Sequence, residues 1–391
     1  MSTSRLLGTG VDYSGLTAST TPGSQRRLLR AHDSCRRGDL STPPPPRTDT
    51  LIAAIELCGD VYCLELAGDE DRFAICEAES AASAVDLVAP GLATARGIDP
   101  DRLRTLAYTH AASELIASID ADIEAAALAL EAATFDRTGS VAVRARDVRS
   151  QTGCSTQAAE RRLGSVLVDR GFSVDLDDPD HELRVLFSEG EVDGEQREGC
   201  LLGWLAVESK RDFGERRPTD RPFFQPGSMA PIDARALVNI AGAGPEATIC
   251  DPMCGTGGLL LEAALVGSQV VGVDAQWKMT RGSRQNLTAL VGEADAEIIH
   301  GDATALPVVD ACVDAVVFDA PYGRQSKIAR HELADLVGGA LAEASRIADR
   351  AVVVADRSWE AEAEDAGWTV DHRFERRVHG TLVRHVHVLS G

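Results

Sequence analysis

The stretch 247–258, ATICDPMCGTGG, indicates the fold of the C-terminal part of this 391-residue chain. An apolar run ends in Asp251, as a buried strand does, and the glycines that follow lead into the apolar residues 259–265. Glycines let the backbone approach a ligand closely, and a helix N-terminus can receive a carboxylate. The residues match neither a dinucleotide fingerprint nor a phosphate-binding loop with its lysine. The pattern predicts a strand, a ligand-binding turn and a helix; the alternative is a glycine-rich turn without a ligand.

Apolar runs and helical patterns alternate from this stretch to the end of the chain. The runs are VVGVDA, AEIIHGDA, DAVVFDAP and AVVVAD, separated by segments of helix length. Strands that alternate with such helices specify a doubly wound, mostly parallel sheet. Two last strands, expected at 368–377 and 382–389, look like the antiparallel pair that ends the class I methyltransferase fold.

Carboxylates follow three successive expected strands. Asp251 leads into the glycine turn, Asp274 can accept both hydroxyls of a ribose, and Asp302 can accept from an adenine amine. Acids at strand ends are common, and Asp302 alone would fit a helix cap as well. Together with the glycine turn, the three favour S-adenosylmethionine (SAM) as the cofactor. The residues predicted to bind it here are Asp251, Pro252, Cys254, Gly255, Gly257, Asp274, Asp302 and Ala303.

The fourth expected strand ends in Asp319-Ala320-Pro321-Tyr322, which we predict to be the catalytic residues. An exocyclic amine on a base is a poor nucleophile, because its lone pair is delocalised into the ring. Acceptors for both N–H groups, the Asp319 carboxylate and the Ala320 carbonyl, would stabilise the charge that develops during methyl transfer. Tyr322 can stack on the base, which is worth about 1–3 kcal/mol in single-strand binders. The alternative is a turn whose proline and glycine serve only its geometry.

Asp319-Ala320-Pro321-Tyr322 resembles the (D/N)PPY motif of amino methyltransferases, with Ala320 where the motif has proline. The backbone carbonyl survives that change, so we expect a less rigid loop with its chemistry retained. DAPYGR (319–324) and RPFFQPGSMAPIDARALVNIAG (221–242) are similar to the archaeal tRNA (guanine(10)-N2)-dimethyltransferase family. This resemblance covers about residues 61–391. It implies an α+β THUMP-type RNA-binding domain followed by an α/β class I, Rossmann-like, SAM-dependent methyltransferase domain.

The resemblance also implies a function and further site residues. The function is methylation of the exocyclic N2 amine of guanosine 10 of tRNA, to N2-methyl- and then N2,N2-dimethylguanosine, on an extruded nucleotide and without a metal. Pro226 and Ser228 should cross the cofactor pocket, while Phe223 and Phe224 flank the cofactor or base, or pack in the core. Alternatives are an amino methyltransferase for another tRNA or rRNA guanosine or for DNA adenine, and a non-catalytic RNA-binding protein.

We expect four segments along the chain. Residues 1–50, with seven arginines, four aspartates and the run PPPP at 43–46, are a disordered N-terminal extension or lie upstream of the true translation start. Residues 61–190 contain the THUMP-type domain, residues 191–230 are a linker, and residues 231–391 are the methyltransferase domain. Within 61–190 the patterns predict strands at 61–66, 140–146 and 183–188, and helices at 70–88, 103–134 and 156–171.

The charge distribution bears on the partner. The net charge is -22, with 36 arginines but three lysines, which resembles a halophilic composition. Such a surface argues against a polyanionic partner, but segments 144–170 and 324–330 each carry a net charge of +3. We therefore retain tRNA as the partner. The residues predicted to contact it are Arg144, Arg146, Arg149, Arg161, Arg162, Arg324, Lys327 and Arg330.

Cysteine usage and hydropathy concern the compartment. None of the nine cysteines forms a C-x-x-C pair, so the sequence gives neither a zinc signature nor a disulfide framework. No apolar run reaches the roughly 18–20 residues that span a bilayer. We expect a cytoplasmic monomer without a metal or a membrane partner.

Overall fold

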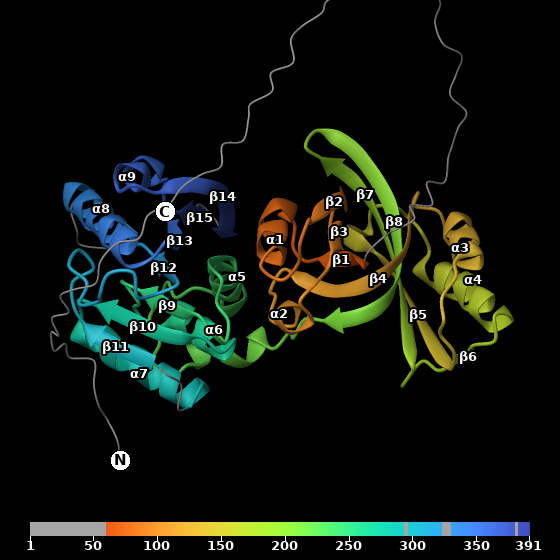
Figure 1. Ribbon diagram of the computed structural model, residues 1–391, viewed down its shortest axis with the longest axis horizontal. Coiled ribbons are helices and arrows are strands. Elements are labelled where there is room, and N and C mark those ends of the chain that lie inside the picture. Colours follow the sequence, from red (N-terminus) through yellow and green to blue (C-terminus); the bar gives the residue numbers. More distant parts are fainter. Residues whose placement is uncertain (1–59, 293–295, 323–329, 380–381) are drawn as a thin grey trace, which may run out of the picture. The chain divides into compact units, whose positions relative to one another are not determined.

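Two β-sheets organise the residues that the computed structural model describes, which are 60–292, 296–322, 330–379 and 382–391 (Figure 1). All of them belong to one compact unit, residues 52–391. The prediction for residues 1–50 lies outside the described residues.

The first sheet has eight strands in the order β2-β3-β1-β4-β8-β7-β5-β6. Its pairs are antiparallel except that β5 runs parallel to β6 and to β7. Leu130, Leu163 and Trp204 are buried where α3 and α4 cover the sheet. The strands are β1 Val61–Leu66, β2 Asp86–Ala89, β3 Leu92–Arg96, β4 Thr109–Ile119, β5 Ser140–Asp147, β6 Ser173–Val174, β7 His181–Val192 and β8 Glu195–Glu208; the helices are α1 Asp71–Ala78, α2 Pro100–Leu103, α3 Ile123–Ala132 and α4 Thr156–Asp169.

Two helix predictions in this region were wrong. The segment 103–134 contains β4 as well as α3, and the helix expected at 70–88 ends at Ala78. Alanine favours a helix in isolation, but β4 pairs with both β1 and β8 and buries Ala111 and Ala112. Burial and pairing in a sheet therefore outweigh local propensity here.

The expected linker at 191–230 also starts too early. Residues 195–208 form β8, which pairs with β4 and β7, because its apolar residues fill the core of the first sheet. After β8 come the short 3-10 helices Phe213–Arg216 and Pro218–Asp220. The loop-rich part of the predicted linker therefore begins after Glu208.

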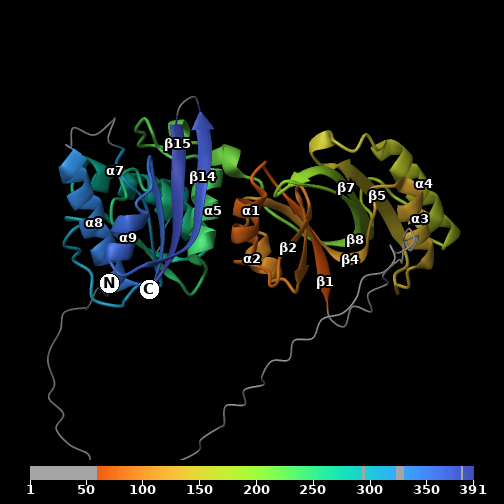
Figure 2. The same cartoon turned by 90° about the horizontal axis from the view of Figure 1, so that it is seen from above.

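The second sheet has the order β11-β10-β9-β12-β13-β15-β14. Strands β11, β10, β9, β12 and β13 are parallel to their neighbours in this series, and β15 lies antiparallel between β13 and β14. Figure 2 shows β14 and β15 side by side. This is the doubly wound sheet with a final antiparallel pair that the sequence predicts. The strands are β9 Thr248–Asp251, β10 Gln269–Asp274, β11 Ala296–His300, β12 Ala315–Asp319, β13 Arg350–Ala355, β14 Thr369–His379 and β15 Leu382–Ser390; the helices are α5 Pro231–Ala241, α6 Gly258–Leu265, α7 Trp277–Leu290, α8 Arg330–Ile347 and α9 Glu360–Asp365.

Helices cover both faces of the second sheet. Leu237 of α5 and Leu260 of α6 belong to one core cluster, whereas Leu341 of α8 belongs to another with Trp359, next to α9. Strands β10, β9 and β12 are parallel neighbours, so their carboxyl ends lie at one edge of the sheet. That edge carries Asp274, Asp251 and Asp319.

Candidate active site

The loop between β9 and α6 is fixed by Asp274 at the end of β10. The N–H of Gly255 donates to Asp274 Oδ2 at 3.0 Å, and the N–H of Gln276 donates to Oδ1 at 2.8 Å. Gly257 caps α6 with a φ of 76°, and a Cβ at this position would overlap Ser283 Oγ. Glycine is therefore required both by the backbone and by the close approach. Each carboxylate oxygen of Asp274 keeps a second lone pair for a ribose hydroxyl.

Asp251 lies deeper at the same edge of the sheet. It is 2% exposed, and its Oδ1 accepts the N–H of Met253 at 3.0 Å. Burial raises the pKa of Asp251 well above its ordinary value, and the nearby carboxylates of Asp274 and Asp319 raise it further. A positively charged ligand beside these carboxylates would offset the cost of their negative charges. The carboxylates at this edge of the sheet therefore fit the positive sulfonium and the ribose hydroxyls of SAM.

The segment before α5 lies against the glycine loop. Ser228 Oγ is 3.2 Å from Thr256 Oγ1. The side chain of Asn286 accepts from the N–H of Phe223 and donates to the carbonyls of Phe223 and Thr256, at 2.8–2.9 Å. Phe223 packs against Gly282, where a Cβ would overlap its ring. Asn286, which we did not predict, joins this segment to the loop, and the ring contact fits the packing alternative for Phe223.

Asp302 is exposed and takes part in a local turn. Its Oδ1 accepts from both the N–H and the hydroxyl of Thr304, each at 2.9 Å, and no helix follows it before β12 among the described residues. The helix-cap alternative is therefore wrong. His300 lies two residues before Asp302. The exposed ring of Trp277 stacks on the His300 ring, with the ring centroids 4.0 Å apart.

Asp319 closes β12 with one buried oxygen lacking a hydrogen bond. Within the described residues, its Oδ1 has no hydrogen-bond partner. Burial raises the pKa of Asp319 to about 6, while Arg384 and a hydrogen bond from Tyr322 oppose the rise. The N–H of Ala320 donates to the carbonyl of Val354 at 2.8 Å and so fixes this loop to β13. The Asp319 carboxylate is thus an acceptor held ready for a donor.

Arg384, on β15, is a site residue that the sequence did not predict. Its Nε donates to the hydroxyl of Tyr322 at 3.0 Å, and its guanidinium is 3.5 Å from Asp233 of α5. Asp233 also accepts from Arg376 at 2.9 Å. Arg384 therefore holds the tyrosine of the 319–322 motif. The available signal was a buried-type strand, LVRHVHVL, that contains one arginine.

Most arginines predicted to contact RNA are paired with the protein's own acceptors. Arg146 pairs with Glu65, Arg149 pairs with Asp71 at 2.5 Å, and Arg162 pairs with Glu124 and Glu131 at 3.0–3.3 Å; Arg144 lies 3.7 Å from Glu182 and donates to the carbonyl of Leu176. Among the described residues, Arg161 has no ion-pair partner. Arg324, Lys327 and the side chain of Arg330 lie outside the described residues. The sequence could not show that Arg146, Arg149 and Arg162 form ion pairs with carboxylates of the protein itself.

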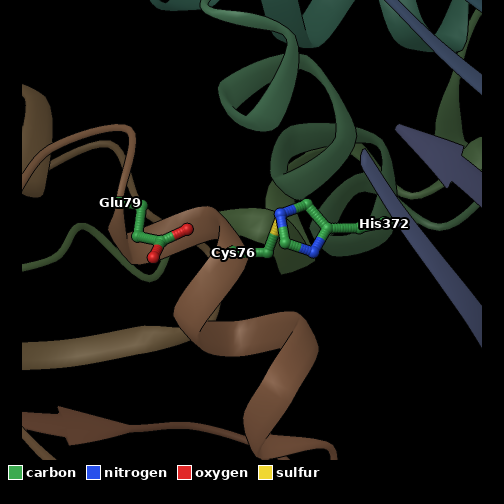
Figure 3. Close-up of side chains that lie close together, drawn as sticks. All are labelled: Cys76, Glu79 and His372. Carbon is green, nitrogen blue, oxygen red and sulfur yellow. The ribbon is translucent and has the colours of Figure 1, made fainter. Parts of the chain in front are cut away.

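One group of described side chains has the spacing of metal ligands. Cys76 of α1, Glu79 and His372 of β14 place one donor atom each within 4.8 Å of the others (Figure 3). Burial raises the pKa of the Cys76 thiol to about 12, so the thiol keeps its proton at neutral pH. Because the Glu79 and His372 side chains are exposed, and exposed groups of this kind commonly lie close together without an ion, we assign no metal to this group.

The described helices and cysteines add two observations. No helix in the described part of the chain is long and apolar enough to cross a bilayer. Seven cysteines are described, and all are free thiols: Cys63, Cys76, Cys154, Cys200, Cys250, Cys254 and Cys312.

The parallel sheet, the glycine loop and the 319–322 motif at the end of β12 define a class I, SAM-dependent amino methyltransferase. A protein-family model that describes an RMKL-like methyltransferase domain matches residues 218–385. A tRNA (guanine(10)-N2)-dimethyltransferase from Methanothermobacter thermautotrophicus is 36% identical over 294 residues, which cover 73% of this chain and 84% of the relative. The chain belongs to that family. The predicted fold class and cofactor are therefore confirmed.

Two further relatives carry similar descriptions. A tRNA (guanine(10)-N2)-dimethyltransferase from Pyrococcus abyssi is 30% identical, over 64% of this chain and 74% of its own. A tRNA (guanine(6)-N2)-methyltransferase from Thermus thermophilus is 32% identical, over 51% of this chain and 57% of its own. All three relatives are named as enzymes that methylate guanine N2 in tRNA.

Proposed function

We propose that this enzyme transfers the methyl group of SAM to the N2 amine of guanosine 10 of tRNA, first once and then a second time. Membership of the dimethyltransferase family supports the reaction and its position. The observation that carries the proposal for the site is the buried Oδ1 of Asp319, which has no partner among the described residues. An N–H group of the amine would donate a hydrogen bond to this oxygen.

In this mechanism the protein positions and polarises the base. SAM supplies an electrophilic methyl group when it is bound. The Asp319 carboxylate accepts one N–H of the amine and the Ala320 carbonyl accepts the other, so negative potential faces the nitrogen as it becomes positive. After the transfer, which leaves S-adenosylhomocysteine, the nitrogen gives up one proton to the Asp319 carboxylate or to water. Tyr322, held by Arg384, stacks on the extruded base. No covalent intermediate with the protein is needed, and the rate comes from orientation and electrostatics.

The N-terminal region, 61–190, would bind the tRNA by its shape and backbone in this proposal. Recognition of folded RNA relies on such features more than on base edges. Arg161 is the predicted contact that has no ion-pair partner among the described residues, so it is a stronger candidate than Arg146 or Arg149. We further propose that the enzyme works as a monomer in the cytoplasm, where its tRNA substrate and reduced thiols would coexist.

A second candidate is methylation of guanosine 6. The Thermus thermophilus relative, named for that position, is 32% identical over about half of this chain. Both reactions would use the same contacts to the amine. They differ in how the tRNA is held relative to the pocket.

The test uses SAM with a labelled methyl group and three tRNA transcripts: the native one, one with adenosine at position 10 and one with adenosine at position 6. We expect labelling of the native and the position-6 transcripts only, with N2-methyl- and N2,N2-dimethylguanosine found by nucleoside mass spectrometry. Undiminished labelling of the position-10 variant would refute the assigned nucleotide.

The variant Asp319→Ala tests the proposed catalytic role. It should lower transfer by at least about 10²–10³-fold, the usual loss on removal of one group that stabilises charge in the transition state. The affinity for S-adenosylhomocysteine (SAH) should stay within a few-fold, because Asp319 faces the amine rather than the cofactor. Near-normal turnover would show that Asp319 does not have this role.

A further inference from the structure

Arg221 is a buried cation whose charge has no counterpart. It is 5% exposed, and its Nε donates to the carbonyl of Arg216 at 3.2 Å. Its Nη1 and Nη2 atoms are buried and have no hydrogen-bond partner in the described part of the chain. Burial lowers the pKa of the Arg221 guanidinium, which reflects the cost of keeping this charge away from water.

The surrounding ion pairs do not supply the missing negative charge. Arg216 binds Glu262 through two hydrogen bonds of 2.7 and 3.0 Å and also binds Asp212 at 2.7 Å. Arg235 is 2.9 Å from the same Glu262. Lys210 also pairs with Asp212, at 2.7 Å. Three arginines and this lysine thus share the two carboxylates, so positive charges outnumber negative ones in the cluster. An unpaired buried charge is strongly unfavourable, and it indicates an anionic ligand.

The unpaired guanidinium lies at the N-terminus of α6. A Cβ on Gly258, the first residue of α6, would lie 3.2 Å from Arg221 Nη1. The free N–H groups of a helix N-terminus attract anions as well. Gly257 and the loop before it form the cofactor site, and Asn286 ties Phe223, two residues after Arg221, to this loop. Two independent features therefore favour an anion at one point of the cofactor pocket.

We propose that Arg221 binds the carboxylate of the methionine part of SAM. The inference rests on the proposed function, because it assigns a residue to the cofactor of that reaction. Guanidinium and carboxylate match in a planar, two-bonded geometry, and Nη1 and Nη2 are the atoms left to make it. An RNA phosphate is a poorer occupant, since Arg221 Nη1 lies beside Gly258, next to the glycine loop that would hold the cofactor. Anchoring this end would fix the direction in which the methyl group points.

The experiment compares two ligands on two variants by isothermal titration calorimetry. The ligands are SAH and its decarboxylated analogue, which keeps the amine. The variants are Arg221→Met and, as a control with the same charge change, Arg217→Met at an exposed arginine in the same segment. In the native protein and the control we expect SAH to bind roughly 10- to 100-fold more tightly than the analogue, as for a hydrogen bond between charged groups. In Arg221→Met the two affinities should agree within about threefold, a gap that corresponds to roughly 0.7 kcal/mol.

Stability separates binding from folding. Thermal unfolding of ligand-free Arg221→Met should occur at or above the native temperature, because an uncompensated charge has been removed. Added SAH should raise that temperature less than in the native protein. A native-like preference for SAH in Arg221→Met, or weaker tRNA binding with unchanged SAH binding, would overturn the proposal. If the native protein methylated no RNA, the proposed function would fail, while the ligand comparison would still test Arg221.

Discussion

At the scale of single residues, we expect the carboxyl group of Asp319 to set a pH limit on transfer. The raised pKa of about 6 means that the group is mostly protonated, and loses its negative charge, at pH values below 6. We expect kcat/KM measured between pH 5 and pH 8 to be constant at the upper end and to fall about tenfold per unit below pH 6. A profile that stays flat to pH 5 would show that ionised Asp319 is not required.

Arg384 allows the electrostatic and the positioning effects to be separated. Its charge lowers the pKa of Asp319, and its Nε holds the Tyr322 hydroxyl. In Arg384→Gln, the acidic limb of the pH profile should move to higher pH and the KM for tRNA should rise. Arg384→Lys keeps the charge but not the geometry of the guanidinium, so we expect the pH limb, and not the KM, to return toward the native value. A merely structural role for Arg384 would leave the pH limb in place.

At the scale of the elements, Gly257 shows what the glycine loop requires. In Gly257→Ala the new Cβ would overlap Ser283 Oγ and the residue would keep a left-handed conformation. Gly292→Ala is the matched control, because Gly292 has a similar φ of 82° and open space around it. Both variants should lose about 1–2 kcal/mol from the backbone conformation. We expect only Gly257→Ala to bind SAH more weakly as well, which calorimetry would measure. Equal SAH affinities of the two variants would contradict the role of the loop.

The strand ends could be predicted because they depend on local pattern. Asp251, Asp274 and Asp319 follow apolar runs that are long enough for one strand each, and the parallel sheet then brings them to one edge. The segment 109–119 could not be predicted, since its helical composition is overridden by pairing with β1 and β8. The role of Arg384 also depends on distance in the chain. It contacts Tyr322, 62 residues away, and no local pattern contains that information.

At the scale of the whole molecule, the paired arginines bear on how tRNA is bound. The net charge is -22, and four of the arginines predicted to contact RNA already bind acceptors in the protein. Fewer phosphate contacts release fewer counterions, so the affinity should depend weakly on salt. We expect a shallower slope of log Kd against log[KCl] than for a basic relative, measured with the same tRNA. An equally steep slope would argue against binding through shape and stacking.

The order of the second sheet has a consequence for the timing of synthesis. The ribosome makes β14 before β15, yet β15 lies between β13 and β14 and carries Arg384. A nascent chain that has completed the 319–322 motif therefore lacks the residue that holds Tyr322. Until β15 has left the ribosome and inserted, the tyrosine is unsupported and the sheet is open at β13. We therefore expect partly synthesised chains to transfer the methyl group poorly, even though the cofactor loop and Asp319 are already made.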